Sequence, residues 1–271
     1  MLSAAKHLDE MQDDRLRVTL RQAQGERCSI SVHGELFEPR AEKTARSPFD
    51  KLRVSGSGPI AALVPVKRLA QAKSRLRPVL SDDQRREFVL AMLEDVLRLL
   101  AGQPAIAATA VVSADEEVLA FARRLGAQPI REPQSVRGLN AALAFAAEAL
   151  ARHGASGLLV LPADVPLATP EDIEAILATA HEAPVVLCPS HSGGTGALAL
   201  RPPQAIPFRF GPHSFAAHRR AAVERGLPVA VVSRPGLALD IDRPEDLPAV
   251  LATNGSRSRE ALRAMAVVAA V

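Results

Sequence analysis

The sequence contains no tryptophan and no tyrosine, and its aromatic complement is eight phenylalanines in 271 residues. Single-stranded nucleic acids stack on aromatic platforms, which this chain therefore lacks. Nucleic-acid binding also leaves the footprint of a concentrated basic face, whereas the formal net charge is only +3 and no long basic run is present. These absences argue against a nucleic-acid partner. A small anionic substrate is more consistent with the mildly positive net charge.

Cysteines and long apolar runs are also scarce. Cys28 and Cys188 lie far apart in dissimilar segments, which argues against both a disulfide framework and a cysteine-based zinc site. No window approaches the roughly 18 uninterrupted apolar residues that a membrane span needs. The first residues lack the basic-then-apolar pattern of a signal peptide. We therefore expect a cytoplasmic protein without a membrane partner.

Two common nucleotide-binding motifs are missing as well. There is no G-x-x-x-x-G-K after the first predicted strand, which excludes a Walker A loop, and no G-x-G-x-x-G follows a strand. His213 and His218 are five residues apart and carry no carboxylate–histidine pattern. We interpret these histidines as surface or capping residues rather than metal ligands.

The chain changes character near residue 58. Residues 1–58 are charged, show neither a sustained helical nor a strand period, and end in a Ser/Gly linker. Segments of this kind bury too little apolar surface to offset the entropy of ordering. We predict a disordered N-terminal extension over 1–58, a folded catalytic domain over 59–252 and a loosely attached tail over 253–271.

Strand-like apolar runs alternate with helix-like periods inside the folded domain. The predicted strands cover residues 60–66, 105–113, 157–161, 184–190, 196–200, 228–233 and 237–242. Helices are predicted from the Ser81–Gln84 capping box, over 115–126, over about 138–153, from Thr169, and over 213–225. Such alternation predicts an α/β fold with a doubly wound, mostly parallel sheet.

Aspartates stand at the ends of two of these predicted strands. Asp164 follows the apolar run 157–161, and Asp240 and Asp242 end the run 237–242 two residues apart, so that their side chains share a face. Each alone is also typical of a turn. Carboxylates that close repel one another unless a cation lies between them. Together the three predict an oxygen-ligand site for Mg²⁺, with Mn²⁺ as the alternative.

Two other acidic pairs are better explained by helix starts. Glu171 and Asp172 follow a proline, and Glu245 and Asp246 repeat the same Pro-Glu-Asp order. Acidic side chains in the first turn interact favourably with the positive end of the helix dipole. We therefore assign these four residues to helix initiation rather than to catalysis.

A basic loop follows the first predicted strand. The segment "VPVKRLAQAKSRL" (64–76) carries the cations Lys67, Arg68, Lys73 and Arg75. Lys and Arg at the carboxyl end of a strand, opposite acidic strand ends, can neutralise a triphosphate. A solvated charged loop is the alternative interpretation.

Two further loops are suited to anions. In "SGGTGALAL" (192–200), three glycines allow backbone N–H groups to approach a ligand. In "FGPHSF" (210–215), Gly211 and Ser214 stand at a predicted helix start, where free N–H groups and the dipole favour a phosphate.

These segments, taken in order, resemble the 2-phospho-L-lactate guanylyltransferase family, which acts in coenzyme F-420 biosynthesis. The resemblance covers about residues 60 to 250 and rests on "VPVKRLAQAKSRL", "SAD" (113–115), "RGLNAAL" (137–143), "LPADVPL" (161–167), "GGTGALAL", "FGPHSF" and "LDIDRPEDL" (239–247). It implies a Rossmann-like fold of the GT-A nucleotidyltransferase type. It also implies GTP as donor, Mg²⁺ as cofactor, and phosphoenolpyruvate or 2-phospho-L-lactate as acceptor, and it leaves a homodimer open.

Site roles follow from the resemblance position by position. The implied metal ligands are Asp164, Asp240 and Asp242, and the implied contacts to the acceptor's phosphate and carboxylate are Thr195, Gly211 and Ser214. The implied catalytic group adds Lys67, Lys73 and Arg75 to Asp164, and the implied nucleotide contacts are Ser113 and Asn140. One position departs from the pattern, because Gly196 stands where many members have asparagine after the threonine. This departure leaves the acceptor undecided, with phosphoenolpyruvate favoured.

The implied chemistry needs no general base, because an ionised phosphate of the acceptor is itself the nucleophile on GTP. Catalysis then depends on positioning and on charge neutralisation, and the chain accordingly shows no Ser/His/Asp or Cys/His set. Sugar-1-phosphate and molybdenum-cofactor nucleotidyltransferases are the alternatives within the fold class. They usually carry a glycine-rich loop after the first strand, whereas residues 64–76 contain no glycine. A non-enzymatic basic binding protein would not need three strand-end aspartates.

Overall fold

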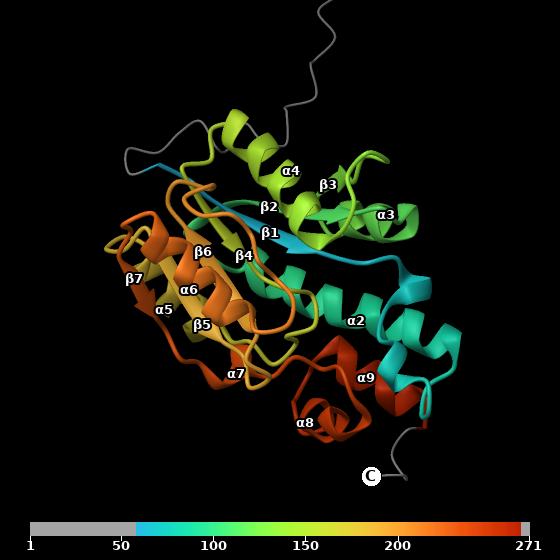
Figure 1. Cartoon of the computed structure of the whole chain (residues 1–271). Coiled ribbons are helices and arrows are strands. Elements are labelled where there is room, and N and C mark those ends of the chain that lie inside the picture. Colours follow the sequence, from blue (N-terminus) through green and yellow to red (C-terminus); the bar gives the residue numbers. More distant parts are fainter. Residues whose placement is uncertain (1–57, 267–271) are drawn as a thin grey trace, which may run out of the picture. The chain divides into compact units, whose positions relative to one another are not determined.

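A seven-stranded sheet organises residues 58–266, the part of the chain that this computed structural model describes. Its strands are β1 (Ile60–Pro65), β2 (Ile106–Ser113), β3 (Gln128–Arg131), β4 (Gly157–Val160), β5 (Val185–Pro189), β6 (Thr195–Leu200) and β7 (Val229–Val231). They lie in the order β3-β2-β1-β4-β6-β5-β7 (Figure 1). Only β6 runs antiparallel to its neighbours, β4 and β5. The predicted mostly parallel sheet is therefore confirmed.

Helices cover both faces of the sheet. They are α2 (Asp82–Ala101), α3 (Glu116–Arg124), α4 (Leu139–Arg152), α5 (Pro170–Thr179), α6 (Ser214–Glu224), α7 (Pro235–Ala238), α8 (Leu247–Leu251) and α9 (Arg257–Ala264). Short 3-10 turns, η2 (Leu69–Gln71), η3 (Ser74–Leu76) and η4 (Pro244–Asp246), complete the described elements. Helices α4 and α6 pack on one face, and α2, α3 and α5 pack on the other.

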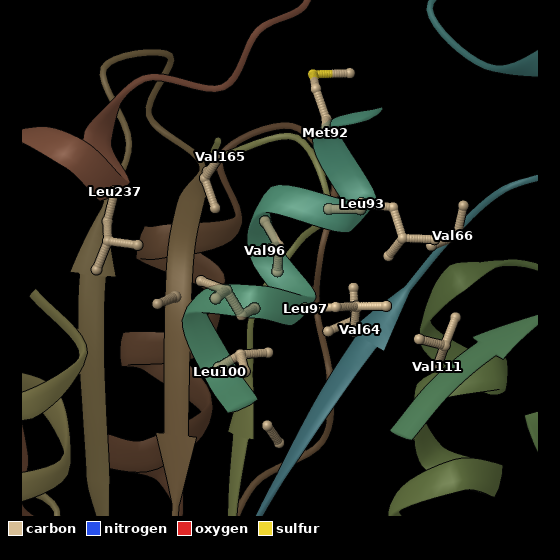
Figure 2. Close-up of a cluster of buried hydrophobic side chains, with 14 of the residues drawn as sticks. Val64, Val66, Met92, Leu93, Val96, Leu97, Leu100, Val111, Val165 and Leu237 are labelled. Atoms are coloured by element: carbon tan, nitrogen blue, oxygen red, sulfur yellow. The ribbon is translucent and has the colours of Figure 1, made fainter. Parts of the chain in front are cut away.

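The central strand β1 divides its side chains between two cores. Ala62 and Val64 belong to the core under α2, whereas Ala61 and Leu63 belong to the core under α4. This alternation follows from the two-residue repeat of a strand, and a strand covered on both faces is apolar throughout. Figure 2 shows the first core, with side chains of α2 lying against the strands.

Two helix starts confirm the capping signals in the sequence. Ser81 and Gln84 form the expected capping box at α2. Thr169 forms a second one with Asp172 at α5, where Pro170 occupies the first turn. Asp172 therefore serves helix initiation, as predicted. Reciprocal side-chain bonds of this kind satisfy N–H groups that have no partner inside the helix.

The predicted strand over residues 237–242 is wrong. Pro235 opens the short helix α7, and the chain then runs irregularly through Asp240 and Asp242. Its backbone bonds go to other loops, because Ile241 N–H donates to the Asp164 carbonyl at 2.9 Å. A strand that no sequence pattern predicted, β3, pairs with β2 at the sheet edge and contains Pro129. Proline is tolerated in edge strands, but it weakens their sequence signal.

The predicted loose tail is also wrong where the structure describes it. Residues 257–264 form α9, whose Leu262 is fully buried in the core beneath α2. Asp95 on α2 accepts hydrogen bonds from the backbone N–H groups of Arg257 and Ser258. The folded unit therefore extends past residue 252. The predicted disordered extension, apart from Gly58, lies outside the described residues.

No helix within residues 58–266 is both long enough and apolar enough to cross a membrane.

Candidate active site

A cavity of about 660 Å³ opens at the edge of the sheet where β1 and β4 end and β6 begins. Pro65 from β1, Asp164 from the loop after β4 and Thr195 at the start of β6 all line it. Because β6 is antiparallel, its first residue lies at the same sheet edge as the carboxyl ends of the parallel strands. Open α/β sheets bind their ligands at this edge. The cavity is therefore the candidate active site.

Lys73 joins two of the predicted aspartates. Its Nζ lies 2.7 Å from Asp164 Oδ2 and 2.7 Å from Asp242 Oδ1. The Lys73 side chain is only 8% exposed, whereas the two carboxylates keep about a third of their surface in contact with solvent. The cation that two close carboxylates require is thus an ammonium of the chain itself. Arg75 adds a longer ion pair, 3.6 Å from Nη1 to Asp242 Oδ2.

The position of Lys73 depends on an arginine that the sequence analysis did not single out. Arg85 on α2 is 2% exposed, and its Nη1 donates to the carbonyl of Ala72 at 2.7 Å. This carbonyl belongs to the peptide group that enters Lys73, which has left-handed backbone angles of φ 49° and ψ 42°. Left-handed geometry is unfavourable for a residue with a Cβ. The buried guanidinium therefore holds the basic loop in the shape that brings Lys73 to the aspartates.

The loop that carries Asp242 is also held by polar bonds. Asp246 Oδ2 accepts from the backbone N–H of Asp242 at 2.9 Å and from that of Arg243 at 2.7 Å. Asp246 thus forms a turn at the start of η4, in agreement with its predicted structural role. The bond from Ile241 N–H to the Asp164 carbonyl ties this loop to the one after β4. The two carboxylates that face Lys73 are consequently held by backbone as well as by charge.

Burial and neighbouring charges shift the pKa values of Lys73, Asp240 and Asp242. Burial alone would lower the pKa of Lys73, but Asp164 and Asp242 raise it above its usual value. Burial alone would raise the pKa of Asp242, but Lys73, Arg75 and Lys67 lower it. The pKa of Asp240 is raised by burial and by the nearby charges of Asp164 and Asp242. Asp240 therefore lies close enough to sense both carboxylates, but it makes no ion pair with Lys73.

The predicted three-aspartate metal site is not preformed. Among residues 58–266, no three His, Cys, Asp or Glu side chains are arranged to hold a metal ion. The donor chemistry still fits Mg²⁺, which proteins usually hold through one or two carboxylates together with substrate phosphates. Asp164 and Asp242 supply two such carboxylates at the cavity wall. The remaining ligands would come from a bound phosphate and from water.

Two hydroxyl groups, those of Thr195 and Ser214, line another part of the same cavity. Thr195 is 6% exposed and Ser214 is 1% exposed, and Ser214 Oγ donates to Thr195 Oγ1 at 3.1 Å. Ser214 is the first residue of α6, and Gly211, with a left-handed φ of 135°, shapes the loop before it. The predicted acceptor-binding residues Thr195, Gly211 and Ser214 are therefore brought together at the cavity. Lys67, from the basic loop, lines it as well.

One of the two histidines does not match its prediction. His213 is exposed at the start of α6, as expected, although its side chain makes no capping bond. His218, one turn into the same helix, is fully buried and lies 3.0 Å from Thr195 Oγ1 through Nδ1. A single histidine on an otherwise ordinary helix gives no sequence signal of such a contact.

The side chains of the two predicted nucleotide contacts are engaged elsewhere. The Asn140 side chain bonds to both backbone polar groups of Phe210. Its Nδ2 donates to the Phe210 carbonyl at 3.0 Å, and its Oδ1 accepts from the Phe210 N–H at 2.7 Å. Ser113 is fully buried and accepts from Asp115 N–H at 3.1 Å. Asp115 in turn accepts from the backbone of Leu69 in the basic loop. Both predicted contacts therefore shape cavity loops, and a direct contact with nucleotide stays a prediction.

Replacing Asn140 by alanine is expected to reduce the free energy of unfolding by about 1–3 kcal/mol, because both backbone groups of Phe210 lose a partner. Urea denaturation measures this loss. Glu148 on the same helix is the control, since its exposed side chain makes only a 3.8 Å pair with Arg152. Glu148→Ala should change stability by less than about 0.5 kcal/mol. Equal losses in the two variants would show that the two hydrogen bonds between Asn140 and the Phe210 backbone do not stabilise the fold.

Gly196, the position that departs from the resemblance, lies against a neighbouring backbone. A Cβ at this residue would lie 1.8 Å from the carbonyl oxygen of Leu237 and 2.9 Å from its carbonyl carbon. Leu237 belongs to α7, which leads directly into Asp240 and Asp242. In this chain the glycine therefore permits the close approach of the segment that carries the two aspartates.

The chain is similar to known proteins over most of its described residues. The sequence profile of the family described as "Guanylyl transferase CofC like" matches residues 60–270. A phosphoenolpyruvate guanylyltransferase of Rubrobacter xylanophilus is 46% identical over 200 residues, which cover 73% of this chain and 96% of that protein. A 2-phospho-L-lactate guanylyltransferase of Methanothermobacter thermautotrophicus is 40% identical over 203 residues, 74% of this chain and 89% of that protein.

A third relative carries a different acceptor in its name. The 3-phospho-D-glycerate guanylyltransferase of Phenylobacterium zucineum is 42% identical over 192 residues, which cover 68% of this chain and 86% of that protein. Among solved structures, a protein from Desulfovibrio desulfuricans G20 described as a nucleotide-diphospho-sugar transferase superposes with a TM-score of 0.63. It is 19% identical and covers 77% of this chain and 96% of its own length, so this likeness concerns the fold alone.

Proposed function

The chain belongs to the family of CofC-like guanylyl transferases, and we propose that it transfers GMP from GTP to the phosphate of a small phosphorylated carboxylic acid. One observation carries the proposal. The cavity combines the Lys73–Asp164–Asp242 group, suited to a triphosphate and its cation, with the buried hydroxyls of Thr195 and Ser214, suited to a small anion.

The acceptor belongs to a narrow chemical class. The three relatives are named for phosphoenolpyruvate, 2-phospho-L-lactate and 3-phospho-D-glycerate, all three-carbon acids that carry a phosphate. The Thr195 hydroxyl and the N-terminus of α6 suit an anionic group of this size, because both can donate hydrogen bonds to it. We propose phosphoenolpyruvate as the acceptor, and the relative with the highest identity quoted above supports this choice.

The reaction can be written from the groups in the cavity. An oxygen of the acceptor's phosphate forms a bond to the α-phosphorus of GTP, and the bond from that phosphorus to the bridging oxygen breaks. Pyrophosphate leaves with the electron pair, so no proton has to be removed from the nucleophile. Lys73, Lys67 and Arg75 neutralise charge on the triphosphate, while Thr195 and the N-terminus of α6, which begins at Ser214, hold the acceptor in line. Positioning and electrostatics of this kind account for most of the catalysis in phosphoryl-type transfers.

Mg²⁺ is part of the proposal, with Mn²⁺ as its substitute. Asp164 and Asp242 would hold it, with Asp240 nearby as a further oxygen donor. Bound there, the ion would withdraw charge from the phosphate oxygens of the nucleotide. Lys73 would then exchange part of its contact with the carboxylates for contact with the triphosphate.

We expect pyrophosphate to be released when the full chain is incubated with GTP, Mg²⁺ and phosphoenolpyruvate. Parallel reactions contain 2-phospho-L-lactate or 3-phospho-D-glycerate, and GTP is replaced in turn by ATP, CTP and UTP. Phosphoenolpyruvate and GTP should give the highest kcat/KM. Equal rates with all four nucleotides would contradict the guanylyl donor, and absence of pyrophosphate with all three acids would contradict the function itself.

The rival nucleotidyltransferases of the same fold differ at the loop after β1. Sugar-1-phosphate enzymes usually have glycines there, whereas this loop places Lys73 against two aspartates. A control with glucose 1-phosphate in place of the acid should release no pyrophosphate. Cytoplasmic location, where GTP is available, and a homodimer remain parts of the proposal.

A further inference from the structure

His218 is a fully buried histidine whose two ring nitrogens are both hydrogen-bonded. Nε2 lies 2.8 Å from the backbone nitrogen of Arg209, and Nδ1 lies 3.0 Å from Thr195 Oγ1. The ring does not line the cavity, whereas Thr195 does. His218 therefore stands one residue behind the cavity wall.

The contact with Arg209 determines which ring nitrogen carries the proton. A backbone N–H can only donate, so Nε2 must accept and has no proton of its own. A neutral imidazole then carries its proton on Nδ1, which donates to Thr195 Oγ1. Burial, with a smaller contribution from the positive charge of Arg209, lowers the pKa of His218 to about 4. The ring is consequently neutral, in this one tautomer, at physiological pH.

Thr195 receives two hydrogen bonds on a single oxygen. One comes from Nδ1–H of His218, and the other comes from the Ser214 hydroxyl at 3.1 Å. A hydroxyl oxygen has two lone pairs and one O–H bond. Since both lone pairs are occupied, the one remaining function of this hydroxyl is donation. Its proton is left for whatever occupies the cavity.

We propose that His218 is a positioning residue that makes Thr195 an obligatory hydrogen-bond donor toward the anionic group of the acceptor. The inference rests on the proposed function, because it assumes that a phosphorylated acid occupies the cavity beside Thr195. Without the imidazole donor, the threonine hydroxyl could turn and accept a hydrogen bond, and a negatively charged acceptor would then face a lone pair. The His218 ring thus favours an anionic ligand by keeping the Thr195 hydroxyl oriented as a hydrogen-bond donor toward the cavity.

The surroundings of the ring support a fixed orientation. The Phe210 ring meets the His218 ring edge-on, with centroids 4.8 Å apart and an interplanar angle of 72°. Phe210 is itself held by the double hydrogen bond to Asn140 on α4. The chain of contacts from Asn140 through Phe210 and His218 to Thr195 joins α4, the 210–214 loop, α6 and β6. Such over-determined polar networks hold groups in one geometry.

Two substitutions separate the two ring nitrogens. His218→Asn places its amide where Nδ1 was and keeps a donor for Thr195, whereas His218→Gln places its amide near Nε2 and keeps an acceptor for Arg209. We expect His218→Gln to raise the KM for phosphoenolpyruvate about tenfold, the usual effect of losing a hydrogen bond to a charged group. His218→Asn should raise it no more than about threefold, because the Thr195 contact survives. The KM for GTP should stay within about twofold of wild type in both.

A double-variant cycle adds a test that a purely structural role would not pass. Thr195→Val removes the hydroxyl and should raise the KM for phosphoenolpyruvate by about as much as His218→Gln, roughly tenfold. Combining the two should add little, because both act through one hydroxyl. His181→Gln is the matched control, since His181 is exposed in the turn after α5. Its KM values should match those of the wild type.

The tautomer itself can be observed without turnover. In ¹⁵N-labelled full-length protein, imidazole nitrogen shifts should show the His218 proton on Nδ1 and no titration between pH 5.5 and 8. A proton on Nε2, or titration in that range, would overturn the proposal. So would equal effects of the Asn and Gln variants, or an equal rise in both KM values. Absence of transfer by the wild-type enzyme with every acceptor would instead overturn the proposed function, and this assignment with it.

Discussion

Replacing Asp164 or Asp242 by asparagine is expected to reduce kcat with GTP by about a hundredfold to a thousandfold. Asparagine keeps the size of the side chain but removes the charge that faces Lys73 and that would hold Mg²⁺. Steady-state turnover across a Mg²⁺ titration measures this loss. Because each variant retains the other carboxylate of the pair, with Asp240 nearby, saturating Mg²⁺ should restore part of the rate. Full turnover at limiting Mg²⁺ would contradict both the metal site and the mechanism built on it.

The same variants should also be less stable in the absence of divalent cations. Relief of carboxylate repulsion would favour the variants, but the 8%-exposed Lys73 ammonium loses one of its two partners. We expect a net loss of about 1–2 kcal/mol, kept small because the carboxylates are a third exposed to water. Glu245→Gln is the control, because Glu245 is an exposed residue with only a 3.6 Å pair to Arg243. Its turnover and stability should both be close to wild type.

Replacing Gly196 by alanine is expected to destabilise the fold by more than about 3 kcal/mol. The added methyl group would lie 1.8 Å from the carbonyl oxygen of Leu237, and a backbone carbonyl cannot move aside as a flexible side chain can. Any shift of α7 would also displace the loop with Asp240 and Asp242, so turnover should fall even in molecules that remain folded. Urea denaturation and kcat, measured on the same preparation, report the two effects.

Gly102→Ala serves as the matched control. A Cβ at residue 102 would find its nearest neighbour, the Leu99 carbonyl oxygen, at 3.5 Å, which is ordinary contact. Its φ of −78° is accessible to any residue, so stability should change by less than about 0.5 kcal/mol. If Gly196→Ala unfolded at the same urea concentration as this control, the close approach of α7 to β6 would be wrong.

The three aspartates line one cavity, although part of the structure predicted for them is wrong. The apolar run that ends just before Asp164 predicts this residue at the carboxyl end of a strand, and the structure places it in the loop after β4. Asp240 and Asp242 were predicted from the alternation of a strand that does not exist. They still reach the cavity because Ile241 N–H bonds to the Asp164 carbonyl and because Asp246 shapes the turn that follows. The bond between Ile241 and Asp164 joins segments whose proximity no periodicity encodes.

The basic loop shows the opposite limit. Its composition predicted cations for a triphosphate, but it did not distinguish Lys73 from Lys67, Arg68 or Arg75. The choice depends on a left-handed backbone at Lys73 and on the guanidinium of Arg85 behind it. Arg85 lies in an amphipathic helix, where an arginine is ordinarily exposed, so its burial could not be predicted from its position.

Sequence alone determined most of the strands and longer helices, because hydrophobic periods, caps and turn residues act between neighbours. It thereby determined the α/β class and the edge of the sheet at which the cavity lies. The ordered motifs added the family. Tertiary structure decided which polar groups meet: Lys73 and Asp242 are 169 residues apart, Asn140 and Phe210 are 70 apart, and Thr195 and His218 are 23 apart. Such contacts depend on how whole elements pack, and a buried histidine has the same local sequence as an exposed one. The fold therefore places Lys73 between Asp164 and Asp242, and it buries His218, interpreted from the sequence as a surface or capping residue, against Thr195.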